Sequence, residues 1–415
     1  MAYAEKRVST AKGSKGKVSW RARYKLPDGS WGSEPGFPTK RTASAWGEEQ
    51  EAAVRAGRWN DPSKTRTPFG EFARLWMKSQ SPRGRTTMNR WERLETHIFP
   101  RWERTQLIDI NWFDTDTWGR SLTCADATID DCFALMSQIL TSAVDAGYLP
   151  ANPLFGRRRT LNTRAPGHAP QDRAPATAAP EAVLRLAQRL GPANGLHVLT
   201  TSFLGQRWGE GIGLHRDKAL LTRREPHNGG FFTCPTLRIE QEVAEYIRRG
   251  SDGSRLGTVH DLEPVKNKWS VRDVDVPPFL ADLLERHLDA WPHDWVFCTP
   301  KGTWWWRNSW WELLRPAADG RKARPKARGR AVKEGWEPTA PGFTMRKGRH
   351  TADSYQAEIG VHPVLAYEQM GHKYPGIKGT YQHPTPAMRQ RRLDGLEEMF
   401  ARALHVLGVK NLWGS

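Results

Sequence analysis

The sequence has no long hydrophobic run and few cysteines, and both shortages exclude classes of protein. No run of roughly 18 apolar residues occurs, and the N-terminal stretch has no apolar segment like that of a secretory leader. We therefore expect an intracellular protein without a membrane span. The four cysteines form no CxxC pair and have no histidine at zinc-ligand spacing, so neither a disulfide framework nor a structural metal is expected.

Acidic residues are outnumbered by basic ones. The 415 residues include 63 Lys and Arg against 45 Asp and Glu, which gives a formal net charge of +18 at pH 7. Such a surplus does not define a fold, but it favours a polyanionic partner, of which nucleic acid is the commonest. A chain of this length suits about two to four domains.

The N-terminal stretch is strongly basic, with eight basic residues and no acidic one between Lys6 and Lys25. Its second half alternates apolar and basic side chains, Trp20, Ala22 and Tyr24 against Arg21, Arg23 and Lys25. This period predicts a half-buried strand with a cationic outer face. With the turn and helical pattern that follow, we expect a small sheet-plus-helix module over residues 1–65. Its cationic face either contacts DNA, which we favour, or is a basic flap.

Residues 66–155 predict helices throughout, because apolar side chains recur at helical spacing. The tryptophans of this segment are more consistent with packing than with base stacking; they are Trp76, Trp91, Trp102, Trp112 and Trp118. Residues 156–179 combine Pro, Ala, Gly and Thr with arginines, including Arg157, Arg158 and Arg159. This composition predicts an extended basic linker that can lie along a phosphate backbone.

A second compact domain is expected over residues 180–400, followed by a C-terminal tail over 401–415. A helix is predicted over 180–190, and strand-like alternation occurs around 231–239 and 271–276. The basic stretch 321–333 contains no acidic residue and predicts a mobile loop. The fold class expected is therefore α+β and multidomain: a small sheet-plus-helix module, an all-helical domain, and a mostly helical domain with a small antiparallel sheet.

Four short segments of the second domain carry groups suited to phosphate chemistry. Arg207 is followed by Glu210, which can hold a guanidinium in place, although such a pair is also an ordinary surface feature. Lys266 lies in a short turn before a strand, where a lysine is usually solvated. Arg349 belongs to Arg346-Lys347-Gly348-Arg349-His350-Thr351, which opens a helix, and Gly371-His372 precedes Tyr381.

Together these segments resemble the tyrosine recombinases, or phage-type site-specific integrases. Arg207 matches the first arginine of the family and Lys266 the β-turn lysine. The second arginine, the Gly-His histidine and the nucleophilic tyrosine are matched by Arg349, His372 and Tyr381, at intervals typical of the family. The resemblance covers the whole chain: residues 1–65 look like an arm-type DNA-binding module, 66–155 like a core-binding domain, and the remainder like a catalytic domain.

The chain departs from the family pattern in two places. Arg346 stands where the family usually has a histidine, which puts the group that assists proton transfer in doubt. Arg346 either contacts the phosphate or pairs with an acidic side chain elsewhere. The stretch between Arg207 and Lys266 is longer than in compact members, which predicts an insertion near 227–257, and Lys268 is an alternative to Lys266.

The residue types suit DNA cleavage without a metal, which requires a nucleophile, a cationic cradle and an acid for the leaving oxygen. The resemblance implies that Tyr381 attacks the scissile phosphate and forms a 3′-phosphotyrosine, so that neither ATP nor another cofactor is needed. Arg207 and Arg349 would hold the non-bridging oxygens, and Lys266 would protonate the leaving 5′ oxygen. His372 would hydrogen-bond to the phosphate or the tyrosine.

The resemblance also implies the partners. We expect double-stranded DNA with core-type and arm-type attachment sites of a phage or mobile element, a homotetramer on that DNA, and a directionality factor or DNA-bending protein. The place of action would be the cytoplasm, at the nucleoid. The alternatives are a catalytically silent DNA-binding regulator and a topoisomerase-like enzyme that cuts and reseals one duplex. An apolar stripe from Leu393 to Leu407 docks either on its own domain or on a neighbouring protomer.

Overall fold

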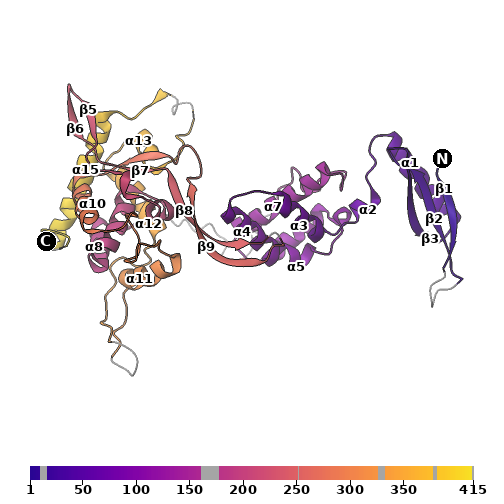
Figure 1. Cartoon of the computed structure of the whole chain (residues 1–415), viewed down its shortest axis with the longest axis horizontal. Coiled ribbons are helices and arrows are strands. Elements are labelled where there is room, and N and C mark those ends of the chain that lie inside the picture. The colour runs from indigo at the N-terminus through magenta and orange to yellow at the C-terminus, as the bar shows by residue number, and fades with distance from the viewer. Residues whose placement is uncertain (10–15, 160–176, 251, 326–331, 377–380, 414–415) are drawn as a thin grey trace. The chain divides into compact units, whose positions relative to one another are not determined.

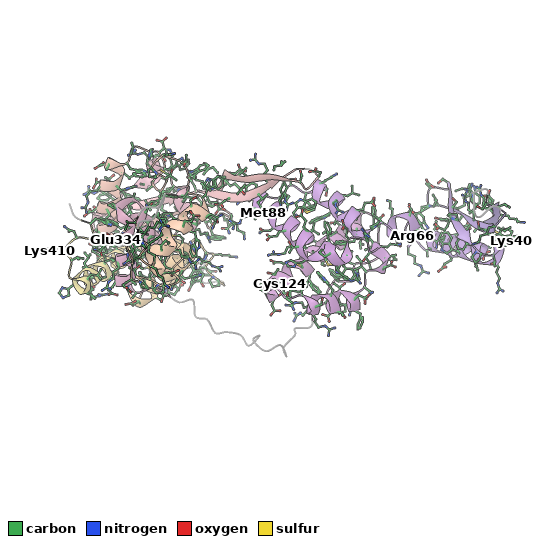
Figure 2. All side chains as sticks on the ribbon, turned by 90° about the horizontal axis from the view of Figure 1, so that it is seen from below. Lys40, Arg66, Met88, Cys124, Glu334 and Lys410 are labelled. Atoms are coloured by element: carbon green, nitrogen blue, oxygen red, sulfur yellow. The ribbon has the colours of Figure 1, made fainter. Side chains whose placement is uncertain are left out.

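A computed structural model describes residues 1–9, 16–159, 177–250, 252–325, 332–376 and 381–413. The chain divides into two compact units (Figure 1). The first unit contains Met1–Ala169 together with Arg248–Gly257, and the second contains Pro170–Ile247 and Thr258–Ser415. Figure 2 shows the side chains of both, with Lys40 and Arg66 labelled in the first unit and Glu334 and Lys410 in the second. The expected α+β class with small antiparallel sheets is confirmed.

The first unit begins with an antiparallel sheet covered by a helix. The strands β1 (Tyr3–Val8), β2 (Val18–Lys25) and β3 (Trp31–Phe37) pair in the order β1-β2-β3, and α1 (Lys40–Arg55) packs against them. Ala22 and Tyr24 are buried, and the Tyr24 ring meets Trp46 of α1 edge to face at 5.3 Å. The alternation within β2 therefore places the intervening basic side chains on the face away from α1.

Between residues 62 and 145 the first unit is helical, as expected. Its elements are α2 (Pro62–Thr65), α3 (Phe69–Ser79), α4 (Gly84–Arg93), the π-turn η1 (Leu94–Ile98), α5 (Phe99–Trp102), the 3₁₀ turn η2 (Leu107–Asp109), α6 (Trp112–Ser121) and α7 (Asp126–Asp145). Four of the five tryptophans are buried in one apolar cluster, and Trp112 packs against it. The assignment of these tryptophans to packing is correct.

The unit also includes a segment that comes much later in the chain. Residues Arg248–Gly257 belong to it, and Arg249 Nη1 lies 2.7 Å from Glu95 Oε1. Gly253 has φ +84°, and a Cβ atom there would overlap the Trp91 ring. Only glycine therefore fits this position without displacing the tryptophan.

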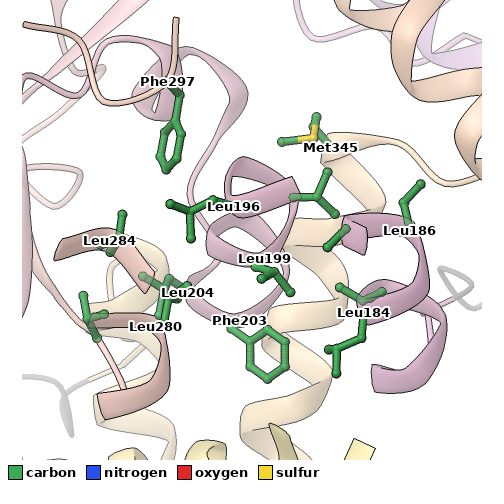
Figure 3. Packing of buried hydrophobic residues seen from close by; sticks show 14 of the residues in the cluster. Leu184, Leu186, Leu196, Leu199, Phe203, Leu204, Leu280, Leu284, Phe297 and Met345 are labelled. Atoms are coloured by element: carbon green, nitrogen blue, oxygen red, sulfur yellow. The ribbon is translucent and has the colours of Figure 1, made fainter. Parts of the chain in front are cut away.

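The second unit is mostly helical. Its helices are α8 (Pro180–Leu204), α9 (Trp208–Ile212), the 3₁₀ turn η3 (Arg216–Lys218), α10 (Pro278–Ala290), α11 (Arg307–Asp319), α12 (Met345–Glu358), α13 (Pro363–Met370) and α15 (Pro386–Leu407). The predicted helix over 180–190 forms and continues to Leu204 across a kink at Gly191, whose φ is +76°. Helix α8 lies at the centre of the core, where its leucines and Phe203 meet Leu280 and Leu284 of α10 (Figure 3).

The second unit also contains a small sheet and two hairpins. Strands β4 (Ala219–Leu220), β7 (Thr236–Ile239) and β10 (Arg272–Asp275) form an antiparallel sheet in the order β10-β7-β4. The stretch in which an insertion is expected forms the hairpins β5 (Arg224–His227) with β6 (Gly230–Thr233), and β8 (Gln241–Arg249) with β9 (Arg255–Pro264). The predicted strand over 231–239 is interrupted at Pro235, which has no N–H to donate to a ladder.

The expected C-terminal tail over 401–415 is wrong. Helix α15 continues to Leu407, and Ala403 and Leu412 are buried in the core of the second unit. The predicted apolar stripe docks on its own unit, because the Phe400 ring stacks on Phe279 at 3.8 Å. Burial of these apolar side chains in the core of the second unit stabilises the docked helix.

The expected linker lies largely outside the described residues, since 160–176 are not described. Its last part belongs to the second unit: Ala178 is buried, its N–H donates to Thr351 Oγ1 at 3.0 Å, and its carbonyl accepts from Tyr355 Oη at 2.8 Å. The tip of the basic loop, 326–331, is likewise outside the described part. None of the described helices is both long and apolar enough to cross a membrane.

Candidate active site

Arg207 and Glu210 form the first part of the site. Helix α8 ends at Gly205, in the left-handed conformation with φ +79°, and Arg207 directly precedes α9. Glu210 is 1% exposed, and its carboxylate accepts the Arg207 backbone N–H at 2.9 Å and Arg207 Nη1 at 2.6 Å. The carboxylate thus caps α9 and holds the guanidinium at once. Because Glu210 is buried, this pair is not an ordinary surface ion pair, and the carboxylate orients the Arg207 guanidinium.

Arg272 of β10 is a second partner of Glu210, and its role was not predicted. Arg272 Nη2 lies 2.9 Å from Glu210 Oε2, and Nη1 lies 3.2 Å from Oε1, so the pair is bidentate. Burial would raise the pKa of Glu210, but the charges of Arg272 and Arg207 outweigh it and lower the pKa to about 2. Glu210 is therefore ionised at neutral pH.

Arg349 lies on α12, beside the same carboxylate. One Nη donates to the Gly205 carbonyl, the other donates to the Met370 carbonyl at 2.5 Å, and Nη1 is 3.9 Å from Glu210 Oε2. Gly205 is required here because a Cβ atom would overlap the Met370 sulfur. Burial, together with the charge of Arg207, lowers the pKa of Arg349 to about 9, which leaves the guanidinium protonated at pH 7.

His372 completes the group. It follows Gly371, the left-handed cap of α13, and its Nε2 lies 3.1 Å from Arg349 Nη2. Burial and the charges of Arg349 and Arg207 lower the pKa of His372. Three arginines therefore gather around one buried carboxylate, and His372 lies against one of them, an arrangement suited to binding a phosphate.

The other predicted catalytic residues are exposed. Lys266 and Lys268 lie in a turn organised by Asn267, whose Oδ1 accepts the Trp269 and Ser270 N–H groups at 3.1 Å, and Lys268 Nζ lies over the Trp269 ring. Arg346 is in the first turn of α12.

Tyr381 is 76% exposed. Among the described residues, no hydrogen bond or ion pair joins Tyr381, Arg346 or either lysine to the arginine and histidine group.

The candidate DNA-binding residues differ in how exposed they are and in whether an acidic side chain pairs with them. Arg21, Arg23 and Lys25 lie half-buried along β2, and Arg157 and Arg158 are exposed. The structure contradicts the expected role of Arg159 in DNA binding. Its guanidinium is 2.8 Å from Asp126 and 2.7 Å from Asp130, and its side chain is only 6% exposed. Two carboxylates neutralise this charge, so Arg159 fastens the start of the linker to α7 and is not available to a phosphate.

The comparisons with known proteins agree with the motifs. No protein-family model matches the chain. A protein of Mycobacterium tuberculosis assigned as the prophage phiRv2 integrase is 25% identical over 378 residues, which cover 88% of this chain and 88% of that protein.

Two solved structures of the Tn1549 transposon integrase share the fold. The complex with transposon right-end DNA has a TM-score of 0.53 and 14% identity, covering 80% of this chain and 100% of that chain. The complex with circular intermediate DNA has a TM-score of 0.53 and 12% identity, covering 78% and 98%. The resemblance to phage-type integrases is thus confirmed by a prophage integrase that is 25% identical over most of its length, and the Tn1549 structures show a shared fold.

Proposed function

We propose that this chain cuts and rejoins DNA at attachment sites of a phage or mobile element through a covalent 3′-phosphotyrosine, without a metal ion or ATP. The observation that carries the proposal is the group around Glu210, which holds Arg207 directly and lies beside Arg349, next to a neutral His372. Arg207, whose side chain is 37% exposed, would offer N–H donors to the non-bridging oxygens of a phosphate. The buried Arg349, whose Nη groups already bind two carbonyls and His372, would add its positive charge beside them. Their charge would stabilise the pentavalent transition state.

The proposed reaction begins with attack by the Tyr381 hydroxyl on the scissile phosphorus. A bond forms between the phenol oxygen and phosphorus as the phenol proton passes to water, the bond to the 5′ oxygen breaks, and Lys266 gives the leaving oxygen its proton. His372 would hydrogen-bond to the phosphate or the tyrosine through Nδ1, the nitrogen that Arg349 leaves free. The phosphodiester energy is kept in the phosphotyrosine, so a 5′ hydroxyl of the partner duplex can reverse the step.

We further propose that DNA is bound by two regions outside this site. Arg21, Arg23 and Lys25 would contact arm-type sites, and Arg157 and Arg158 would follow the backbone beside core-type sites. The Tn1549 integrase structures contain transposon right-end DNA or circular intermediate DNA, which supports a DNA partner here. A homotetramer on DNA, a directionality factor or DNA-bending protein, and action at the nucleoid in the cytoplasm are part of the same proposal.

A suicide DNA substrate, nicked so that the 5′ end diffuses away after cleavage, tests the proposal. The wild-type chain should accumulate covalent protein on DNA, and Tyr381→Phe should form none while it binds the same DNA with nearly unchanged affinity. Tyr374→Phe is the matched control, because Tyr374 packs against Tyr367 at 5.1 Å in the same segment. Covalent adducts that persist in Tyr381→Phe and disappear in Tyr374→Phe would reassign the nucleophile.

The two alternatives give different outcomes. A silent regulator derived from an integrase would bind DNA and form no adduct in any variant. A topoisomerase-like cutter would form the adduct and relax supercoiled DNA, but would not exchange strands between two duplexes. A strand-exchange assay with one labelled and one unlabelled duplex distinguishes this enzyme from a recombinase.

A further inference from the structure

The segment that carries Tyr381 joins α13 to α15, and one residue of β10 contacts both of these helices. That residue is Asp275, which is fully buried. It follows Arg272 in the same strand, so it stands close in sequence to the residue that holds Glu210. Neither the motif pattern nor the proposed chemistry assigns Asp275 a role.

On the α13 side, Asp275 pairs with Gln369 through its backbone. The Asp275 N–H donates to Gln369 Oε1 at 3.1 Å, and Gln369 Nε2 donates to the Asp275 carbonyl at 3.2 Å. Arg272 Nε donates to the Gln369 carbonyl at 2.8 Å. These bonds fix the last turn of α13, directly before Gly371 and His372, and they satisfy a carbonyl that a helix end leaves unpaired.

On the α15 side, Asp275 binds two arginines through its side chain. Arg389 Nη1 lies 2.9 Å from Asp275 Oδ2, and Arg392 Nη2 donates to the same oxygen. Arg389 also reaches Glu368 of α13 at 2.5 Å, and Arg392 Nη1 donates to the Leu365 carbonyl at 3.3 Å. Although burial opposes it, attraction to Asp275 and Glu368 raises the pKa of Arg389.

The energetics of this cluster favour a geometric role. Asp275 and Arg392 are both completely buried as side chains, while Asp275 Oδ1 and Arg392 Nε have no hydrogen-bond partner among the described residues. A buried ion pair with unmet hydrogen bonds stabilises a fold little compared with apolar side chains of similar volume. It does, however, tie each charge to one location.

We propose that Asp275 is a positioning residue for Tyr381, because it holds the first turns of α15, which begins at Pro386 shortly after the tyrosine, against α13. Tyr381 is 76% exposed, and residues 381–385 join it directly to the start of α15. This inference rests on the proposed function, in which Tyr381 is the nucleophile.

The test separates delivery of the tyrosine from activation of the phosphate. Arg389→Gln removes one link between Asp275 and α15 at a side chain that is 17% exposed, so the fold should tolerate it better than loss of Asp275 itself. Arg391→Gln is the matched control on the same helix, since Arg391 is exposed. Asp275→Asn is the second variant, to be used if it folds.

Two reactions are measured at saturating suicide substrate. Cleavage by Tyr381 should fall about 10- to 100-fold in Arg389→Gln, the usual effect of a nucleophile displaced by about 1 Å, and should not change in Arg391→Gln. In a Tyr381→Phe background, hydrogen peroxide serves as the nucleophile: its anion attacks phosphorus and the 5′ oxygen leaves with a proton. In that background the peroxide reaction should be equally fast with and without the Arg389→Gln substitution.

Two results would overturn the inference. One is an unchanged rate of tyrosine cleavage in a folded Arg389→Gln protein. The other is an equal fall in tyrosine and peroxide cleavage, which would place the effect in the phosphate cradle. If the wild-type chain forms no covalent adduct at all, the proposed function fails first, and the inference fails with it.

Discussion

Arg349 donates a hydrogen bond to Nε2 of His372 across 3.1 Å, and this contact defines the protonation state of the histidine. A protonated imidazole carries N–H on both nitrogens and cannot accept such a bond. The lowered pKa of His372 agrees with a neutral ring at pH 7. His372 therefore offers one N–H, on Nδ1, and no positive charge.

The rate of DNA cleavage should accordingly fall in acid. The pKa of His372 lies below its ordinary value of about 6.5, so the neutral form predominates at pH 7 and is lost as the pH falls through the lowered pKa. We expect single-turnover cleavage by the wild type to decline as the pH falls through this lowered pKa. His372→Asn should be slower at pH 7 and should lack this decline. An identical decline in both proteins would assign it to another group.

Lys266 and Lys268 can be distinguished by the leaving group. Lys266→Ala should slow cleavage of an ordinary phosphodiester far more than cleavage of a substrate with sulfur at the 5′ bridging position, because a thiolate leaves without an acid. Lys268, whose Nζ lies 4.9 Å from the centre of the Trp269 ring, provides the control as Lys268→Ala. If sulfur rescues Lys268→Ala instead, the two lysines exchange roles.

Arg346 should act through charge, because an arginine cannot accept a proton near neutrality. It is exposed and has no ion pair with a described residue, which weakens the alternative of a distant acidic partner. We expect Arg346→His to retain activity and Arg346→Ala to lose roughly 10- to 1000-fold in cleavage rate. Thermal unfolding of the same preparation serves as the check, since lowered stability with an unchanged rate would indicate a structural arginine.

Removal of residues 1–65 should spare binding to core-type sites and abolish binding to arm-type sites. The paired substitutions Arg21→Gln and Arg23→Gln should reduce arm-site affinity and the salt dependence of that binding, since fewer counterions are released. Arg41→Gln, an exposed change at the start of α1, is the control. Footprints on both site types that survive the deletion would contradict the assignment of this module.

His197 should make the fold sensitive to acid. Its ring is stacked on Phe297 at 4.5 Å, neither nitrogen has a partner among the described residues, and burial lowers its pKa to about 3. His197 therefore binds a proton in the unfolded chain but not in the folded chain, so the free energy of unfolding falls as the pH drops below about 6.5. Between pH 7 and 5 this loss is about 2 kcal/mol.

His197→Phe should remove that part of the pH dependence. Urea unfolding at both pH values measures it, and comparison within each protein cancels any packing cost of the larger ring. The same pH dependence in both proteins would show that another group is responsible.

Local patterns in the sequence predicted the elements that depend on neighbours in the chain. Glu210 follows Arg207 within one helical turn, so their pairing could be inferred from spacing alone. Tryptophans such as Trp102 were placed in a core because large apolar side chains at helical spacing seldom remain exposed. The stripe from Leu393 to Leu407 ends where α15 ends, so the tail boundary at 401 was set inside a helical pattern that was already visible. The burial of Leu412, beyond that helix, had no such signal.

The buried charges could not be predicted, because their partners lie far away in the sequence. Alternation in β10 places Arg272 on the face of the buried Val274 and Asp275 on the opposite face, yet both charged side chains are buried. Their burial depends on Glu210 and Arg392, which other elements supply. The one sequence signal for this burial is the presence of charged residues inside a short strand flanked by valines.

The contribution of Arg248–Gly257 to the first unit affects the order of events during synthesis. Domains usually fold as the chain leaves the ribosome, N-terminal part first. Here the contacts of Arg249 with Glu95, and of Gly253 with Trp91, cannot form until residue 257 has emerged. The first unit therefore stays incomplete while residues 170–247 of the second unit are translated, and a chain truncated before that point would lack the Gly253 contact with Trp91.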